Sequence, residues 1–532
     1  MTTRIADERG LDASGWLLVA GIVLASLTEA LAGTVVALGR GDIMGDTHAS
    51  LDQFASFDVS YTALKLVGFA LSPWLLTRIE PRNALVASTL AMGVASALAM
   101  VTARLDALSG LRALQGLAGG IVLVTGQAIL FLTFPRRRQP LLQALFAMGA
   151  VVAPATLAPA MQGWLIDNLS WTWIFYGILP LALAGAGLVM IADPPPMPPV
   201  VAWRLDWAGM ALLGCAMSGA TYVLTQGSRW DWFEAGRILW LSGLAGGCLV
   251  LFLLHQRRAA RPALFDLSVF RNDDFTFAFL VSFVAGAALF GSAFLIPSFA
   301  VSVLGFTPAA AGGLLLPSGA LFAGALLLSA FLVQTCRTPP LASVPFGILL
   351  IMAAMWMLSG SNGDSGAPDM MPAILLRGLG LGFLFLSLTL VAFDRLPPAN
   401  LASGIGLFSI GRQLGGLIGV AGLQTLIDHQ AVANQAVLGA ALNPGSPLLA
   451  DRIASLTAIL VTRGMDAASA AKAATGMLGR ATAGQASVIA FDTAFSVVAL
   501  LFVFAAPALI GVKIGLARAA RRRGAADAEV IS

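Results

Sequence analysis

The chain has 532 residues, of which 58% are hydrophobic and 11% are charged, whereas about 25% of residues are charged in ordinary soluble domains. This composition excludes a soluble enzyme or binding module and indicates an all-α integral membrane protein. The net charge of +4 at pH 7 does not indicate a nucleic-acid partner, because the arginines gather in particular loops, as membrane topology requires.

The first part of the chain is predicted to be a six-helix bundle. Residues 1–14 are polar and form the expected cytoplasmic N-terminus. Residues 15–192 contain six apolar segments, each close to the length of about 20 residues that crosses a bilayer as a helix. They lie at 15–38, 54–76, 84–103, 108–134, 141–166 and 173–191.

The first two segments carry ionisable residues, which are costly inside a membrane and mark a functional site by default. Glu29 lies in the first segment, and Asp58, Tyr61 and Lys65 share one face of the second at positions i, i+3 and i+7. At about 1.5 Å per residue, Glu29 matches Lys65 in depth and Asp58 matches Arg112. We therefore predict two ion pairs.

A carboxylate that binds a proton in one conformation and releases it in another is what proton coupling requires. Glu29 and Asp58 are the candidate proton carriers, and Arg112 is the charge that modulates them. Lys65 has two open roles, since a buried lysine either neutralises a carboxylate or titrates itself.

Two further helices separate this bundle from a second one. The proline-rich stretch at 193–199 cannot continue a helix and is expected to be a stiff connector. It opens region 193–274, in which helices at 207–224 and 238–254 precede an arginine-bearing cytoplasmic loop.

Region 275–511 is predicted to be the C-terminal six-helix bundle, which gives about 14 transmembrane helices in all. Its segments lie at 277–301, 309–333, 341–358, 371–393, 404–427 and 486–511. Arg377, Arg412 and Asp492 are its buried ionisable residues, and each is either functional or a paired structural charge. The alanine-rich outer segment 428–485 either docks a partner or caps the helix ends, and residues 512–532 form a basic cytoplasmic tail.

An internal repeat supports the two-bundle division. Leu-Arg-Ala-Leu at 111–114 opens the fourth helix, and Leu-Arg-Gly-Leu at 376–379 opens the corresponding helix of the second bundle. If the helices alternate, the arginine-rich loops share one side, which the positive-inside rule assigns to the cytoplasm. We expect a multi-pass protein of the bacterial cytoplasmic (inner) membrane with both termini in the cytoplasm.

Two stretches are distinctive at the level of motifs. Arg-Ala-Leu-Gln-Gly at 112–116 matches a fourth-helix motif, and Ala-Pro-Ala-Met-Gln-Gly at 158–163 is similar to an antiporter motif that ends the fifth helix. With these and with similar stretches at 166–180, 205–209, 226–227, 231–233 and 266–270, the chain resembles the fourteen-helix drug:proton antiporters of the major facilitator superfamily, of the EmrB/QacA type. The resemblance covers nearly the whole chain.

The resemblance implies a proton-driven secondary transporter that exports small lipophilic compounds by alternating access of two bundles. Gln115 belongs to its cavity, and Pro154, Pro159 and Gly163 belong to its gating helix. It also implies a periplasmic adaptor and an outer-membrane channel as partners if the organism is Gram-negative. The chain departs from the family at Thr28, where Asp is usual, and the acidic residue follows one position later.

Other functions stay open at this point. Export of an endogenous metabolite or organic anion would use the cationic side chains as anchors. A polytopic membrane enzyme would need a catalytic or metal-binding cluster at one membrane face, whereas His48, His255 and His429 are scattered, so neither a metal nor a cofactor is expected. A non-transporting sensor is the third alternative.

Overall fold

The computed structural model of the chain describes residues 12–102, 104–192, 204–258, 264–442 and 445–531. Within these ranges the secondary structure is helical and contains no strand. The described residues include 14 helices that are long and apolar enough to cross a membrane, so the predicted number of spans is confirmed. The polar N-terminus up to residue 11 and the proline-rich connector 193–199 lie outside the described residues.

The N-terminal bundle contains five continuous spanning helices and one interrupted span. The continuous helices are α1 (Ala13–Thr34), α3 (Leu51–Leu75), α4 (Pro81–Met100), α5 (Leu105–Thr133) and α8 (Thr172–Ile191). A short helix, α2 (Val36–Thr47), follows α1 after a break at Val35, so the first predicted segment, 15–38, continued past the end of α1. The starts of α1 and α3 are fixed by side-chain caps: Asp12 accepts from Gly15 N, and Ser50 forms a capping box with Gln53.

The fifth span is divided into η1 (Arg136–Arg138), α6 (Gln139–Ala147), η2 (Met148–Leu157) and α7 (Ala158–Asn168). The middle piece, η2, is a π-helix that contains Pro154, and Pro159 stands in the first turn of α7. A proline inside a helix removes one backbone donor, and the wider π-turn accommodates the lost bond. The interruption of the fifth span therefore coincides with its two prolines.

The two additional helices are α9 (Trp207–Gln226) and α10 (Gly236–Arg258). They are joined by a short turn that contains η3 (Ser228–Trp230) and η4 (Trp232–Glu234). Helix α9 packs against α3 and α16, so the inserted pair lies beside both bundles.

After η5 (Leu267–Arg271), the C-terminal bundle contains α11 (Asp273–Ser302), α12 (Pro308–Gly313), α13 (Leu316–Gln334), η6 (Pro340–Ser343), α14 (Val344–Leu358), α15 (Ala367–Phe393), α16 (Pro398–Ala441) and α18 (Ala467–Ile531). The helices α12 and α13 together make one span, as do η6 and α14. Two six-helix bundles with two inserted helices are therefore observed, as predicted.

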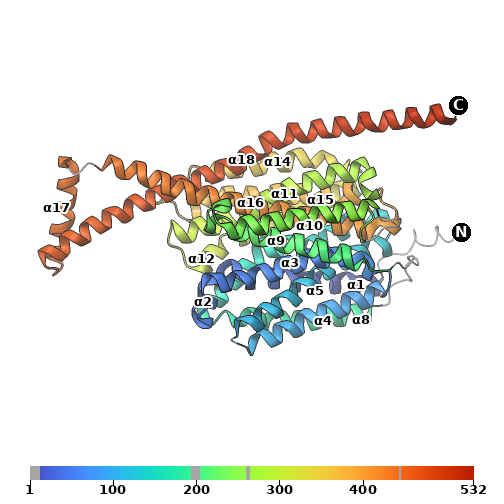
Figure 1. Ribbon diagram of the computed structural model, residues 1–532, viewed down its shortest axis with the longest axis horizontal. Coiled ribbons are helices and arrows are strands. Elements are labelled where there is room, and N and C mark those ends of the chain that lie inside the picture. Colours follow the sequence, from blue (N-terminus) through green and yellow to red (C-terminus); the bar gives the residue numbers. More distant parts are fainter. Residues whose placement is uncertain (1–11, 103, 193–203, 259–263, 443–444, 532) are drawn as a thin grey trace.

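An arm projects from one end of the molecule (Figure 1). It consists of the end of α16, the separate helix α17 (Pro447–Thr462) and the beginning of α18. We call the end that carries this arm the outer end and the opposite end the inner end. The predicted boundaries at residues 427 and 486 were wrong as helix ends, because α16 and α18 continue through them into the arm without a break.

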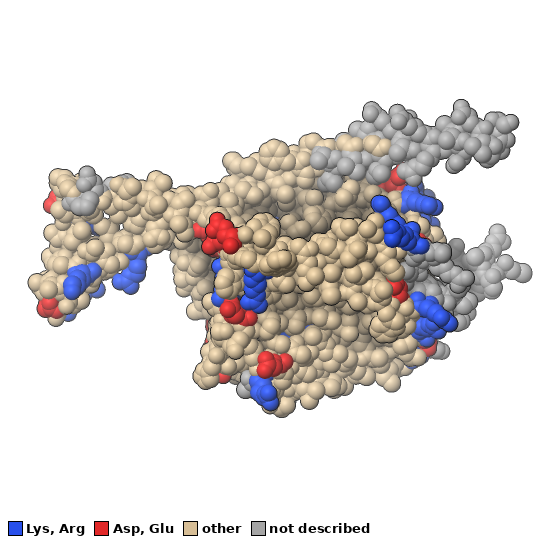
Figure 2. Space-filling view, in the orientation of Figure 1, with Lys and Arg blue, Asp and Glu red and all other residues tan. Residues whose placement is uncertain are grey.

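Charged side chains gather at the two ends of the helical body (Figure 2). On the face in view, a band almost free of Lys, Arg, Asp and Glu separates them. An uncharged band between two charged rims is the surface that a bilayer requires of a spanning helical protein.

Candidate functional site

Glu29 lies at the centre of a buried polar cluster. Its carboxylate Oε1 is 2.5 Å from Lys65 Nζ and accepts a hydrogen bond of 2.8 Å from Tyr61 Oη. The side chain of Glu29 is 2% exposed and that of Lys65 is 12% exposed. The predicted Glu29–Lys65 pair is therefore confirmed, and Tyr61 is a third member that joins the same oxygen.

Glycines of α5 bring these groups together. A Cβ atom at Gly116 would clash with the backbone carbonyl of Tyr61, and one at Gly120 would clash with that of Lys65. The two helices therefore touch along their backbones. Gly119 leaves space for Glu29, because a Cβ atom there would lie 2.9 Å from Glu29 Cγ.

Arg112 lies beside this cluster and binds the backbone of α1. It donates 2.6 Å and 3.0 Å hydrogen bonds to Ala32 O and Gln115 Oε1, and its guanidinium lies 4.1 Å from the centre of the Tyr61 ring. Gln115 in turn donates to Ser96 Oγ at 2.8 Å. The side chains of the fourth-helix motif thus tie α5 to α1 and α4.

The predicted ion pair between Asp58 and Arg112 was wrong as a direct contact. The two charges interact electrostatically, but no ion pair within 4.0 Å joins them among the described residues. Arg112 uses its Nη1 donor on the carbonyl of Ala32 and on Gln115 instead. Equal depth in the membrane does not bring two side chains together when their helices turn them to different neighbours.

Arg377 of α15 repeats the position of Arg112 in the second bundle. It is fully buried, and its Nε donates a 2.7 Å hydrogen bond to Ser292 Oγ of α11, the first helix of its bundle. Its Nη1 and Nη2 atoms are buried without a hydrogen-bond partner among the described residues. The two arginines thus occupy corresponding positions in the two bundles, but Arg377 lacks the hydrogen-bond acceptors that surround Arg112.

Arg412 and Asp492 have different surroundings. Arg412 of α16 lies 6.0 Å from the centre of the Phe385 ring and interacts electrostatically with Glu29 of the other bundle. Asp492 is on α18, which packs against α11, α14 and α16, and its Oδ1 is buried without a partner among the described residues. The structure brings Arg412 toward the Glu29 cluster and leaves Asp492 at the periphery of the bundle.

The predicted gating motif lies where the bundles meet at the outer end. A Cβ atom at Gly163 would clash with the carbonyl of Pro308, and one at Gly312 with that of Pro159. Asp167 accepts a 2.9 Å hydrogen bond from Ala309 N, in the first turn of α12. Asp167 lies in the stretch 166–180 that carries part of the resemblance, and its place at the end of the fifth span, beside the motif, is the signal for it in the sequence.

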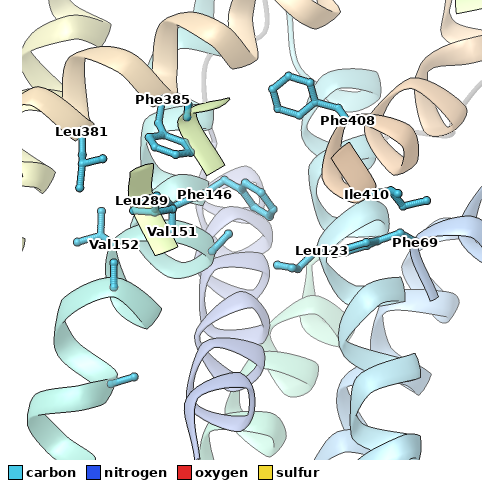
Figure 3. Close-up of a cluster of buried hydrophobic side chains, with 14 of the residues drawn as sticks. Phe69, Leu123, Phe146, Val151, Val152, Leu289, Leu381, Phe385, Phe408 and Ile410 are labelled. Atoms are coloured by element: carbon cyan, nitrogen blue, oxygen red, sulfur yellow. The ribbon is translucent and has the colours of Figure 1, made fainter. Parts of the chain in front are cut away.

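The bundles also touch at the inner end and in the middle. Near the inner end, the rings of Phe131 and Phe393 lie 5.5 Å apart, and a Cβ atom at Gly406 would lie 2.6 Å from Phe69 O. Between the ends, apolar side chains of both bundles form one buried cluster (Figure 3). Its labelled members are Phe69, Leu123, Phe146, Val151 and Val152 from the first bundle and Leu289, Leu381, Phe385, Phe408 and Ile410 from the second. The two bundles are therefore in contact at both ends and between them.

The described residues contain no group of three or more His, Cys, Asp or Glu side chains arranged to hold a metal ion. A pocket of about 280 Å³ lies at the inner end of the second bundle, with Ser329, Thr338, Ser343 and Phe383 in its wall. It lies away from Glu29, which is in the other bundle.

Comparison with known proteins gives the family. The sequence profile of the Major Facilitator Superfamily matches residues 18–420. The colistin resistance protein EmrB of Acinetobacter baumannii is 24% identical over 448 residues, which cover 84% of this chain and 86% of that protein. The multidrug export protein EmrB of Escherichia coli is 25% identical over 438 residues, which cover 81% of this chain and 84% of that protein.

The fold is also found among solved structures. The crystal structure of the human organic anion transporter MFSD10 (TETRAN) is similar with a TM-score of 0.55 at 12% identity, covering 92% of this chain and 99% of that one. At this identity the likeness concerns the fold alone. Because the superfamily profile matches most of its length, the chain belongs to the Major Facilitator Superfamily.

Proposed function

We propose that this protein is a proton-driven exporter of small lipophilic compounds that works by alternating access. The observation that carries the proposal is the buried Glu29 carboxylate, which is bound by Lys65 and Tyr61 and interacts electrostatically with Arg412 of the second bundle. The names of two similar proteins, a multidrug export protein and a colistin resistance protein, support an export function. The apolar cluster between the bundles offers surfaces suited to such compounds once the bundles part.

Coupling follows from the neighbours of Glu29. In this conformation Lys65 and Tyr61 both bind the Oε1 atom of the Glu29 carboxylate. The Arg412 charge comes from the second bundle, so a rocking motion removes it from Glu29. We infer that Glu29 exchanges these partners for a proton during the cycle, while Asp58 and Arg112 tune the exchange from the outer side. Tyr61 and Gln115 position the cluster.

The membrane setting and partners are part of the proposal. The protein resides in a bacterial inner membrane, with both termini in the cytoplasm and the arm of α16, α17 and α18 in the periplasm. Arginines 136, 137 and 138 at the inner end and the arm at the outer end agree with that orientation. In a Gram-negative cell the arm is the surface for a periplasmic adaptor, which would connect to an outer-membrane channel.

Efflux in a bacterium that lacks its own pumps tests the proposal. Wild type and Glu29→Gln are expressed at equal levels, and accumulation of fluorescent dyes and labelled weak acids is followed with and without a proton uncoupler. We expect uncoupler-sensitive export by wild type and its loss in Glu29→Gln. Export by Glu29→Gln that still responds to the uncoupler would move the proton role to Asp58, and export insensitive to the uncoupler would contradict proton coupling.

A further inference from the structure

One face of α15 carries a cation followed by apolar side chains along the contact between the bundles. Arg377, Leu381 and Phe385 recur at i, i+4 and i+8, so they lie on the same face of the helix. Leu381 and Phe385 belong to the buried cluster between the bundles (Figure 3). Arg377 therefore lies about 6 Å, one helical turn, from that cluster on the side of the outer end.

Arg377 is a buried charge without compensation. Its counterpart Arg112 binds Ala32 O and Gln115 and interacts with the charges of Asp58 and Glu29. Arg377 has Ser292 as its single hydrogen-bond partner among the described residues, and no carboxylate interacts with it there. A buried guanidinium is strongly destabilising unless an anion or several acceptors satisfy it.

Among the charged side chains inside the membrane, cations outnumber carboxylates around the path between the bundles. Around the path between the bundles, the carboxylates are Glu29 and Asp58, and the cations are Lys65, Arg112, Arg377 and Arg412. Asp492 does not compensate the difference, because neither Arg377 nor Arg412 interacts with it. A cargo with one or two negative charges would balance the site.

We propose that Arg377 is the binding residue for the anionic head of an amphipathic cargo, with a carboxylate as the preferred head group. The free Nη1 and Nη2 atoms form the fork that accepts a carboxylate with two parallel hydrogen bonds. The apolar body of the cargo lies along Leu381 and Phe385. The Arg412 guanidinium lies 6.0 Å from the centre of the Phe385 ring. The site opens when the bundles part. This inference rests on the proposed transport function and names a substrate class for it.

Ser292 offers a way to fill the site from within. Its Oγ lies 2.7 Å from Arg377 Nε, so Ser292→Asp would place a carboxylate against the guanidinium. We expect this variant to be more heat-stable than wild type and to lose anion binding, because the internal carboxylate competes for the same donors.

The test is binding to purified protein in lipid nanodiscs, measured by calorimetry with empty nanodiscs subtracted. The probes are dodecanoate, dodecanol and dodecyltrimethylammonium, which share one apolar chain and differ in the charge of the head. We expect wild type to bind dodecanoate. Arg377→Gln should bind it at least about tenfold more weakly, because the charge-assisted hydrogen bonds to the head group are lost. Arg377→Lys keeps the charge but not the two parallel donors, so its affinity for dodecanoate should lie between those of wild type and Arg377→Gln.

Arg395→Gln is the matched control, because it removes one arginine charge from the 73% exposed position that pairs with Asp274 at the inner end. Its dodecanoate affinity should equal that of wild type. The proposal is overturned if wild type does not bind dodecanoate, or if Arg377→Gln and Ser292→Asp both retain full affinity. Should Arg377→Gln fail to fold, Ser292→Asp decides alone.

The binding test requires no proton gradient, so its outcome is separate from that of the efflux test. Loss of dodecanoate binding in Arg377→Gln together with export by Glu29→Gln would leave the anion site standing and reject the proton role of Glu29. Unchanged dodecanoate binding in Arg377→Gln together with loss of export in Glu29→Gln would reject the anion site and support the proton role of Glu29.

Discussion

Glu29 and Lys65 form a buried ion pair whose energy depends on the presence of both partners. The Nζ–Oε1 distance is 2.5 Å, and both side chains are largely shielded from solvent. Breaking a buried pair by removing one partner leaves an unpaired charge, whereas removing both leaves none. The direct contact favours the neutralising role of Lys65 over separate titration.

A double-mutant cycle measures this dependence. We expect Lys65→Met to lower the free energy of unfolding by about 3–5 kcal/mol, because it strands the Glu29 carboxylate. The double variant Glu29→Gln/Lys65→Met should recover most of that loss. Thermal or denaturant unfolding of the purified variants measures both. Additive effects of the two substitutions would mean that the pair is not energetically coupled.

The sequence was sufficient for one pair and not for the other. Glu29 and Lys65 were matched by depth alone, because the rise per residue of a helix converts position into height. The same argument misassigned Arg112, since height says nothing of the direction in which a side chain points. The acceptor that Arg112 binds is a backbone carbonyl, which every residue carries and no sequence pattern marks.

At the scale of single elements, the packing of α3 against α5 depends on glycine. A Cβ atom at Gly116 would clash with the carbonyl of Tyr61, whereas Gly110 on the same helix has no atom within 4 Å of its Cβ position. The close approach at Gly116 and Gly120 makes this side of α5 a small-residue packing face.

Two alanine substitutions on α5 separate packing from helix propensity. Gly116→Ala should destabilise the protein by about 1–3 kcal/mol, because the backbones must move apart. Gly110→Ala should be neutral or stabilise it by up to about 1 kcal/mol, because alanine favours the helix. Unfolding midpoints in detergent provide the comparison. Equal effects of the two substitutions would contradict the argument from close packing.

The sequence predicted the membrane-spanning parts of the helices correctly, but it did not predict how far α16 and α18 continue beyond the membrane. Hydropathy identifies the part of a helix that needs an apolar solvent, and α16 and α18 continue into the arm with polar and alanine-rich turns. Intrinsic helix propensity and capping govern those turns. Asp466 caps α18, with its Oδ1 accepting from Ala468 N and Ser469 N at 3.1 and 3.0 Å.

The Asp466 cap gives the arm a pH dependence. Hydrogen bonds from the side chain and backbone of Ser469 lower the pKa of Asp466 below its ordinary value of 3.8. The stabilising contribution of the carboxylate is therefore complete above that value and is lost as the pH falls through the lower pKa of the folded state. We expect amide protection in the first turn of α18 to decrease with acidification.

Hydrogen exchange checks the cap with Asp466→Asn as its control. Asparagine retains a capping oxygen but does not titrate. Its first-turn protection should therefore be independent of pH over the range in which the wild-type value changes. A parallel decrease in both proteins would assign the effect to another group.

At the scale of the whole molecule, contacts at both ends hold the bundles together. Gly163 and Gly312 admit close contact at the outer end, and the Phe131–Phe393 pair and Gly406 mark the inner one. A transporter that works by alternating access must open one of these sets of contacts to expose its binding site. The two-bundle division was predictable from the repeat, but the conformation was not, because it depends on small differences between alternative packings of the same helices.

Widening the outer contact should shift this equilibrium. We expect Gly163→Val to separate α7 from α12, because its side chain would occupy the position of Pro308 O. Spin labels at positions 168 and 302, introduced after replacement of the free cysteines Cys215, Cys248 and Cys336, report the distance across the outer end. The distance distribution should lengthen in Gly163→Val.

Gly177→Val serves as the control, since nothing lies within 4 Å of its Cβ position. It should leave the distribution unchanged. An identical distribution in Gly163→Val and wild type would show that this contact does not limit outer opening.

The turn between α9 and α10 joins both bundles at the outer end. Arg229 lies 2.7 Å from Asp52 at the start of α3, while Ser228 and Trp232 donate hydrogen bonds to Asp428 and Thr425 of α16 at 2.7 and 2.9 Å. If the bundles separate at this point, the inserted helices stay with one bundle and their attachment to the other one breaks.

The arm has a mechanical consequence. Both of its roots, α16 and α18, belong to the C-terminal bundle and enter the arm without a break in the helix. The 14 residues of α16 from 428 to 441 extend about 21 Å beyond the predicted span. Any rotation of that bundle is therefore transmitted to the tip as a larger displacement, as in a lever. A protein bound at α17 would therefore move with the C-terminal bundle.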